Sequence, residues 1–240
     1  MSRRWKHNVA QLAVTLSANA GLSLELGGHR IWVDALHTQK VPGFSCVDKQ
    51  LQGRMLQSPA FAEPELILYT HCHPDHFSKE LTQAAKQLYP NAKLLLPEQQ
   101  YADQILITGD RYTYRHDDLE LTFLRLPHEG TQYAGVSHYG LFLSWQEKHI
   151  LLPGDCETAS PALAEAVKDA AIDGAILNFP WLTLKKGREF VRSVLRPKHW
   201  LVCHLPFEAD DVNGYRRSTH AAAENVHILE EPLQTVTIEI

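Results

Sequence analysis

Three histidines and an aspartate fall within six consecutive positions, in the segment His71-Cys-His-Pro-Asp-His76. The segment follows directly on an apolar run at residues 66–70. Imidazole and carboxylate groups are ligands for divalent metal ions. A cluster this dense is hard to explain as packing, because each buried polar group needs a partner. The segment therefore predicts a metal site.

The spacing within the segment favours two ions over one. In an extended chain residues i and i+2 lie on one side, so His71 and His73 can hold the same ion. Pro74 keeps His73 extended and redirects the chain after it. Asp75 and His76 then face elsewhere, toward a second ion. Six residues cannot complete two coordination spheres, so further ligands must come from distant parts of the chain.

Three later segments offer such ligands, each after a strand-like apolar stretch. The candidates are His128 after residues 119–126, Asp155 after residues 151–152, and His204 after residues 200–203. Sheets in α/β proteins usually carry their sites at strand ends. These elements would therefore place the distant ligands.

The whole set resembles the metallo-β-lactamase superfamily. The matching features are the His-x-His-x-Asp-His motif at 71–76, the lone His128, the Gly-Asp pair at 154–155 and the late His204. The stretch 19–34 is similar to the family's opening hairpin, so the resemblance covers nearly the whole chain. The motifs are specific as a set, whereas the Gly-Asp pair or His204 alone would mean little.

The resemblance implies which side chains share each ion. His71, His73 and His128 would bind one metal, Asp75, His76 and His204 would bind the other, and Asp155 would bridge the two. Five imidazoles and two carboxylates suit two divalent ions, with zinc preferred and manganese or iron as alternatives.

The third ligand of the first ion has competitors. His128 is preferred because it directly follows a strand and precedes Gly130. His138 begins another apolar strand and is either a pocket residue or a polar strand neighbour. His116 lies in a charged turn and is predicted to be solvated. The histidines without ligand spacing are predicted to lie at the surface: His7, His29, His37, His149, His199, His220 and His227.

Strands and helices alternate along the chain. The predicted strands include residues 14–18, 22–26, 30–33, 226–229 and 235–240, and the predicted helices are 78–89, one opening at 160–161, 187–196, and 208–225 broken at Gly214. This mix predicts an α+β fold of two sheets with helices outside. The resemblance implies a four-layer αββα sandwich with the metals at one edge between the sheets. The long segment 38–64 would form a flap over the site or cover the sheet edge.

Composition predicts one globular domain spanning residues 1–240. Apolar residues make up 44% and charged residues 21% of the chain, and no linker or repeat divides it. The formal charge of −5 disfavours nucleic acid as a partner, and the basic stretches at residues 3–6, 185–188 and 216–217 are short and scattered. No stretch approaches the roughly 20 apolar residues of a membrane helix. The N-terminal residues lack a continuous apolar signal core, which predicts a cytoplasmic protein.

Four cysteines indicate a reducing compartment, and three of them adjoin proposed ligands. Alternation of side chains aims Cys72, Cys156 and Cys203 away from the metals, which favours packing beneath the site. The alternative for Cys156 is a role as a metal ligand, since zinc accepts thiolate.

Two adjacent metal ions would supply hydrolytic chemistry. Ions about 3.5–4 Å apart can share a water, lower its pKa toward ~7, and polarise the bond to be cleaved. Asp75 is the candidate to orient the resulting hydroxide nucleophile or to carry its proton to the leaving group. The sequence therefore predicts a metallo-hydrolase.

The substrate is predicted from weaker features. The short acidic chain and the ending Cys203-His-Leu-Pro look like the branch with lactonases of phosphorylated sugar acids and related phosphodiesterases. A small-molecule lactone or phosphodiester is thus preferred. The alternatives are an RNA- or DNA-processing nuclease, an iron-dependent sulfur or oxygen redox enzyme of the same superfamily, and a metal-binding scaffold. Candidate substrate contacts are Tyr133, His138, Trp181 and Arg111.

Overall fold

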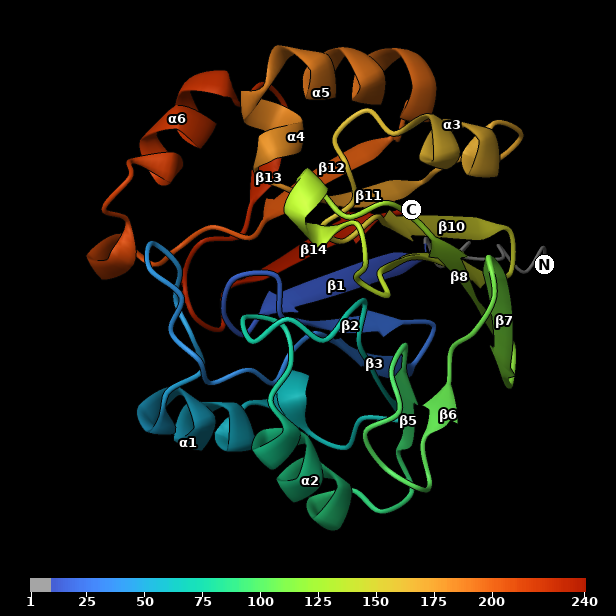
Figure 1. The fold of residues 1–240 in the computed structure, drawn as a ribbon, viewed down its shortest axis with the longest axis vertical. Coiled ribbons are helices and arrows are strands. Elements are labelled where there is room, and N and C mark those ends of the chain that lie inside the picture. The colour runs from blue at the N-terminus through green and yellow to red at the C-terminus, as the bar shows by residue number, and fades with distance from the viewer. Residues whose placement is uncertain (1–9) are drawn as a thin grey trace, which may run out of the picture.

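The computed structural model describes residues 10–240. The basic stretch at residues 3–6 and His7 lie outside the described residues. Two sheets pack face to face, and helices cover the outer side of each (Figure 1). The predicted α+β arrangement of four layers, αββα, is therefore confirmed.

The first sheet has the strand order β14-β1-β2-β3-β4-β5-β6. Its strands are β1 Gln11–Leu16, β2 Leu22–Leu26, β3 His29–Val33, β4 Leu66–Leu68, β5 Lys93–Leu96, β6 Ile105–Leu106 and β14 Thr235–Glu239. The strands from β14 to β3 pair antiparallel, and those from β3 to β6 pair parallel. Strands β3 and β4 therefore end at the same edge.

The second sheet has the order β13-β12-β11-β10-β9-β8-β7 and repeats the same half-antiparallel, half-parallel pattern. Its strands are β7 Arg111–His116, β8 Leu119–Arg125, β9 Tyr139–Trp145, β10 Lys148–Leu152, β11 Gly174–Asn178, β12 His199–Cys203 and β13 His227–Ile228. Because β9 runs antiparallel to both β8 and β10, the strands β8, β10 and β12 share one direction. Their carboxyl ends meet at one edge, where the predicted distant ligands follow.

The helices divide between the two outer layers (Figure 1). They are α1 Lys49–Gln57, α2 Lys79–Leu88, α3 Pro161–Val167, α4 Pro180–Thr183, α5 Lys185–Phe190 and α6 Tyr215–Ala222, with short 3-10 turns at Pro59–Phe61, Thr131–Tyr133 and Glu208–Asp210 and a π-turn at Val191–Leu195. Helices α1 and α2 cover the first sheet, and α3 to α6 lie on the side of the second. Within residues 10–240, no helix has the length and apolar character needed to cross a membrane.

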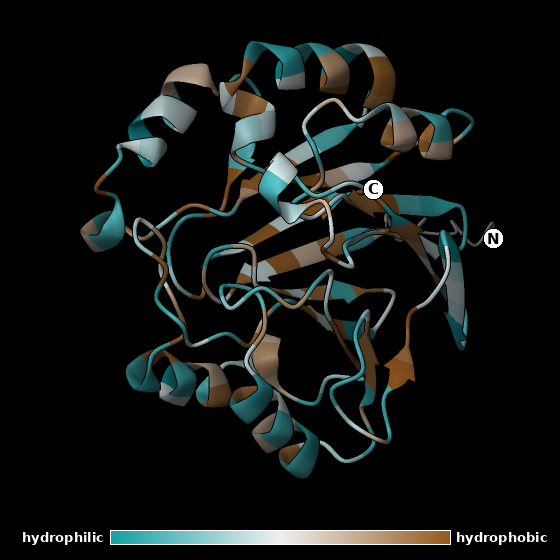
Figure 2. Ribbon diagram, in the orientation of Figure 1, coloured by the Kyte–Doolittle hydropathy of each residue, from teal (hydrophilic) through white to brown (hydrophobic). Residues whose placement is uncertain are grey.

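Alternating side chains on the strands explain the layers. The inner faces of both sheets form one core, in which Leu24 of β2 and Leu141 of β9 are fully buried. The opposite faces of the strands pack under the helices in two further clusters. Figure 2 shows the apolar residues concentrated on the central strands and the polar residues on the outer helix surfaces. This is the pattern expected when each sheet buries both faces.

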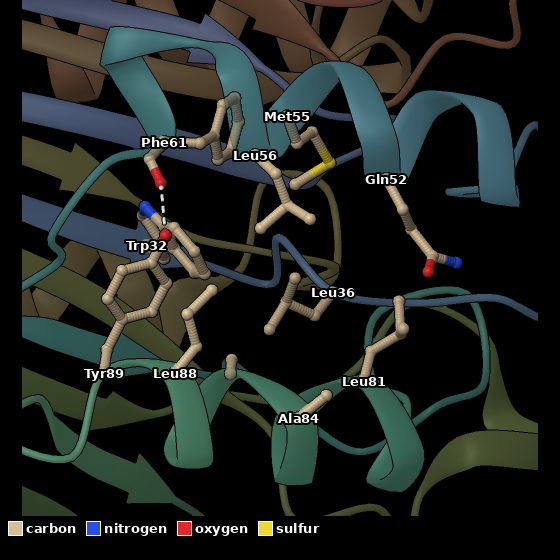
Figure 3. Close-up of a pocket in the computed structure, with 11 residues that line it drawn as sticks. Trp32, Leu36, Gln52, Met55, Leu56, Phe61, Leu81, Ala84, Leu88 and Tyr89 are labelled. Carbon is tan, nitrogen blue, oxygen red and sulfur yellow. Dashed lines mark hydrogen bonds between the residues drawn. The ribbon is translucent and has the colours of Figure 1, made fainter.

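An apolar groove of about 160 Å³ lies between α1 and α2, away from the strand ends that carry the predicted ligands. Figure 3 shows Met55 and Leu56 of α1 facing Leu81 and Leu88 of α2 across it. The hydroxyl of Tyr89 donates a hydrogen bond to the carbonyl of Phe61 at one end. The segment 38–64 thus covers the outer face of the first sheet with α1.

Candidate metal centre

The structure brings the seven predicted ligands together at one edge of the two sheets. The segment 71–76 follows β4 in the first sheet, and His128, Asp155 and His204 follow β8, β10 and β12 in the second. The ligands therefore face one another across the interface between the sheets.

The first group contains His71, His73 and His128. Each contributes a donor nitrogen, and these nitrogens lie within 4.8 Å of one another. Nε2 of His71 and Nε2 of His128 are buried and have no hydrogen-bond partner among the described residues. A buried imidazole nitrogen without a partner is costly, and a metal ion would satisfy both. His116, one of the competitors, lies at the end of β7 instead.

The second group contains Asp75, His76 and His204, whose donor atoms also lie within 4.8 Å of one another. Nε2 of His76 is 3.2 Å from Nε2 of His204. Oδ2 of Asp75 lies 4.0 Å from the same nitrogen of His204. His204 has a backbone φ of 62°, a left-handed conformation that is uncommon for residues other than glycine. Such strain is typical of functional positions.

Asp155 lies between the two groups. Its Oδ1 is 3.4 Å from Nε2 of His76 and 3.6 Å from Nε2 of His204. Its Oδ2 is 3.7 Å from Nε2 of His128. One oxygen thus faces each group, which is the placement that a bridging carboxylate needs.

Asp34 is a residue of the site that the sequence reasoning missed. It directly follows β3, and its Oδ2 lies 3.0 Å from Nδ1 of His76. The same carboxylate accepts hydrogen bonds from the backbone N–H and the hydroxyl of Thr70, at 2.8 and 2.6 Å. Its position in the sequence could have marked it as a candidate, because Asp34 follows an apolar strand, as Asp155 does.

These hydrogen bonds orient the imidazoles. The hydroxyl group of Thr70 donates its proton to Asp34. The hydroxyl oxygen of Thr70 therefore accepts a hydrogen bond from Nδ1–H of His71 at 3.0 Å. Nδ1–H of His128 donates to the carbonyl of Glu129 at 2.8 Å. In His71, His76 and His128 the Nε2 atom is therefore the one turned toward the site. Metal-binding histidines are held in the same way by carboxylates and carbonyls.

The electrostatics suit a cation. Burial raises the pKa of Asp155, but the imidazoles of His76 and His204 outweigh burial and hold that pKa well below its usual range. Burial and then the neighbouring His76 lower the pKa of His71 well below its ordinary value. Burial also lowers the pKa of His76, yet the carboxylates of Asp155 and Asp34 raise it well above normal. An ionised Asp155 and a neutral His71 are the forms that bind metal.

Asn178, at the end of β11, holds the side chain of Asp155 in place by hydrogen bonds. Its Nδ2 donates to Oδ1 of Asp155 at 2.6 Å and to the carbonyl of Gly154 at 3.1 Å. Gly154 has a φ of 61°, and a Cβ there would lie 2.8 Å from Nε2 of His138. Only glycine fits both the turn and the contact.

His138 is buried beside the first group without belonging to it. Its Nδ1–H donates to the carbonyl of Leu126 at 3.1 Å, and its ring centroid lies 5.3 Å from that of His71. Burial lowers the pKa of His138 to about 4. The imidazole of His138 is therefore uncharged at ordinary pH and borders the site.

A cleft of about 210 Å³ opens onto the centre, with His128, Asp155 and His204 in its wall. Three aromatic side chains line it, Phe44, Phe179 and Trp181. The ring of Phe44 meets that of His204 edge to face at 4.9 Å. The segment 38–64 therefore also contributes to the site through Phe44.

Tyr133 and Arg111 differ in their placement. Tyr133 packs against His73 and His128, with centroid distances of 4.9 and 4.7 Å, and is 38% exposed. Arg111 begins the edge strand β7 and lines a different hollow with Glu165. Arg111 is thus not part of the cleft.

Two of the histidines predicted to lie at the surface are buried, so that prediction was wrong for them. His37 is fully buried, and neither ring nitrogen has a hydrogen-bond partner in the described part of the chain. His29 is 8% exposed and is held by Glu65 and Asp118. Long-range partners decide burial here, and spacing along the sequence does not reveal them.

The cysteines near the centre are free thiols. Cys156 and Cys203 are buried, and burial raises the pKa of Cys156 to about 12. A protonated, buried thiol fits packing, which was the preferred prediction.

The chain is similar in structure to proteins that share little of its sequence. Igni18, a metallo hydrolase from the archaeon Ignicoccus hospitalis, is 16% identical over 96% of this chain and 99% of its own, with a TM-score of 0.66. The metallo-β-lactamase fold protein YhfI from Bacillus subtilis is 12% identical over 96% of this chain and 100% of its own, with a TM-score of 0.64.

CmlA, a diiron β-hydroxylase from Streptomyces venezuelae, is 14% identical over 95% of this chain, which spans 54% of CmlA, with a TM-score of 0.61. No protein-family model matches the sequence, and no curated protein matches it. None of the three similar structures is described as a lactonase, so the finer resemblance to that branch stays a prediction. At these identities the likeness concerns the fold, and this chain has the metallo-β-lactamase fold.

Proposed function

We propose that the protein is a metal-dependent hydrolase that binds two divalent ions. Zinc is the preferred metal. The observation that carries this proposal is the position of Asp155, whose two oxygens face two separate groups of ligands. His71, His73 and His128 would hold one ion, Asp75, His76 and His204 would hold the other, and Asp155 would contact both.

Bound metal ions would lower the pKa of water and polarise the bond to be cleaved. The protein's own residues supply the remaining functions. Asp34, Glu129 and Thr70 keep the imidazoles oriented. The side chain of Asp75 is 16% exposed, so it can accept a proton from the attacking water and pass it to the leaving group.

The cleft favours a small uncharged substrate, such as a lactone, over a phosphodiester. Its lining includes three aromatic side chains and the carboxylates of Glu129 and Asp155, but no lysine or arginine. Phosphate recognition usually relies on arginine or lysine. The same lining disfavours a nuclease, which would need a basic surface.

The proposal is tested by elemental analysis of the purified protein together with a hydrolysis screen of lactones, thioesters and phosphodiesters. We expect at least two zinc or manganese ions per chain and turnover of lactones. The Asp75→Ala variant should lose activity about 10²–10⁴-fold, the usual contribution of a proton-transfer group. The exposed Asp169 supplies the control, because Asp169→Ala should leave turnover unchanged. A protein that binds no metal, or an Asp75→Ala variant with full activity, would contradict the proposal.

An iron-dependent redox enzyme is the second candidate. The same ligands suit iron, and the diiron protein CmlA shares the fold. Bound iron with oxygen consumption, in place of zinc with hydrolysis, would select this candidate.

A further inference from the structure

A second group of metal-ligand side chains lies away from the candidate centre. One donor atom from each of His29, Glu65 and His116 lies within 4.8 Å of the others. His29 begins β3 and Glu65 directly precedes β4, whereas the candidate centre follows the far ends of these strands. The group therefore lies at the opposite end of the first sheet.

The two distances from Glu65 to the imidazoles are close to those of a zinc site. Zinc–nitrogen and zinc–oxygen bonds of about 2.0–2.1 Å put tetrahedral donor atoms roughly 3.3 Å apart. Nε2 of His116 is 3.3 Å from Oε2 of Glu65. Nδ1 of His29 is 2.7 Å from the same oxygen. An ion would thus require this second pair to separate by only about 0.6 Å.

Asp118 positions the ring of His29. Its Oδ1 lies 2.6 Å from Nε2 of His29, and its Oδ2 accepts a hydrogen bond from the indole of Trp145 at 2.7 Å. With Nε2–H held by Asp118, Nδ1 of His29 faces Glu65, and the ring centroid of His29 lies 5.9 Å from that of His116. A carboxylate on the far nitrogen of an imidazole is the usual support of a metal-binding histidine.

The group is both anchored and accessible. His29 is 8% exposed, while the side chains of Glu65 and His116 are 39% and 22% exposed. A hollow of about 470 Å³ is lined by Glu65 and His116. An ion could enter through this hollow and keep a water in the remaining coordination position.

We propose that His29, Glu65 and His116 form a separate site for a zinc-like divalent cation, with Asp118 as the positioning residue. Two imidazoles and a carboxylate are ligands that zinc accepts. His29 and Glu65 belong to the first sheet, and His116 ends β7 of the second. The bound ion therefore links the two sheets.

A proton on His29 is the competing occupant. Burial lowers the pKa of His29, but its hydrogen bonds to Asp118 and Glu65 outweigh burial and raise that pKa. A protonated His29 would join both carboxylates and leave no room for an ion. His116 distinguishes the two occupants, because binding of a metal ion requires this side chain and protonation of His29 does not.

The test counts zinc ions on chelator-treated protein after titration with zinc alone and removal of weakly bound metal. We expect His116→Gln and Glu65→Gln each to bind one zinc equivalent fewer than the unchanged protein. His220→Gln is the matched control, because His220 pairs with Glu230 at 2.9 Å without a second histidine and should retain full binding. Cobalt in place of zinc should give tetrahedral absorption that decreases in His116→Gln.

Equal zinc equivalents in the folded His116→Gln variant and the unchanged protein would overturn the proposal. The comparison is a difference between variants, so it stands whether or not the candidate centre binds metal. Hydrolysis, measured in parallel, should be unchanged in His116→Gln. The proposal and the proposed function can therefore fail independently.

Discussion

Oδ2 of Asp34 lies 3.0 Å from Nδ1 of His76 and holds that imidazole with Nε2 directed at Asp155 and His204. Asp34 has a φ of 50° and is 2% exposed, so it holds a strained backbone in a buried position. Its hydrogen bonds with Thr70 keep the carboxylate in place. The orientation of His76 thus depends on a residue that is outside the two proposed groups of three ligands, although one of its oxygens lies within 4.8 Å of nitrogens of His71 and His76.

Replacing Asp34 by Asn should weaken metal binding about 10–100-fold, because supporting residues of metal ligands contribute on that scale. Competition with a chromogenic chelator would measure the zinc affinity. Asp173→Asn is the control, since Asp173 is also buried and accepts a backbone hydrogen bond from His149 far from the centre. Unchanged zinc affinity in Asp34→Asn would show that His76 is held by other means.

Replacing Asn178 by Ala should lower zinc affinity about tenfold, because Asp155 loses the hydrogen bond that fixes its Oδ1. Isothermal titration of zinc into the metal-free variant would give the change. The exposed Asn91→Ala variant should bind zinc like the unchanged protein. An affinity loss as large in Asn91→Ala would contradict the assigned role.

Removing metal should destabilise the fold. Zinc at about 100 times its dissociation constant adds roughly 2.7 kcal/mol to the free energy of unfolding for each independent site. Urea unfolding with zinc and with excess chelator would measure the difference. Identical midpoints under both conditions would argue against metal binding by the native state.

His37 should make the stability of the metal-free protein depend on pH. Burial lowers its pKa to about 3, so between the unfolded value near 6.5 and pH 3 the unfolded chain binds a proton that the native state does not. Stability from this residue is present above about pH 6.5 and is lost as the pH falls, by about 2 kcal/mol at pH 5.

The His37→Gln variant should lack this part of the pH dependence, although its stability at pH 8 will differ. Urea unfolding of metal-free protein from pH 8 to pH 5 would test it. The exposed His227→Gln variant serves as the reference. Equal slopes in His37→Gln and the unchanged protein would refute the prediction.

Phe44→Ala should raise KM about tenfold with little change in kcat, because the ring lines the cleft and contributes an aromatic contact of about 1–1.5 kcal/mol. Steady-state kinetics on the substrate found in the screen would measure both constants. Leu56→Ala, in the groove between α1 and α2, should change neither. A decrease in kcat alone would instead place Phe44 among the groups that act in the transition state.

The strands and the dense 71–76 segment were predicted because both depend on local patterns, whereas the four layers and the grouping of the distant ligands followed from the resemblance. Apolar alternation revealed the strands, and His128, Asp155 and His204 each lie within three positions of the end of one. Asp34 follows a strand and Asn178 ends one, but a single aspartate or asparagine carries too little information to be selected. Their partners are distant along the chain, since His76 lies 42 positions after Asp34.

Burial of single histidines was the weakest part of the prediction. His29 was expected at the surface, yet it is held by Asp118, which lies 89 positions later. His37 has no local signal for burial, since it follows β3 in a loop. Both outcomes depend on tertiary contacts, which periodicity in one segment does not encode.

The ligands of the candidate centre come from both sheets, with 71–76 on the first and His128, Asp155 and His204 on the second. Neither half of the chain holds a complete coordination sphere by itself. Tight metal uptake during refolding should consequently appear only when the halves have docked. Metal uptake would therefore report on the docking of the two sheets.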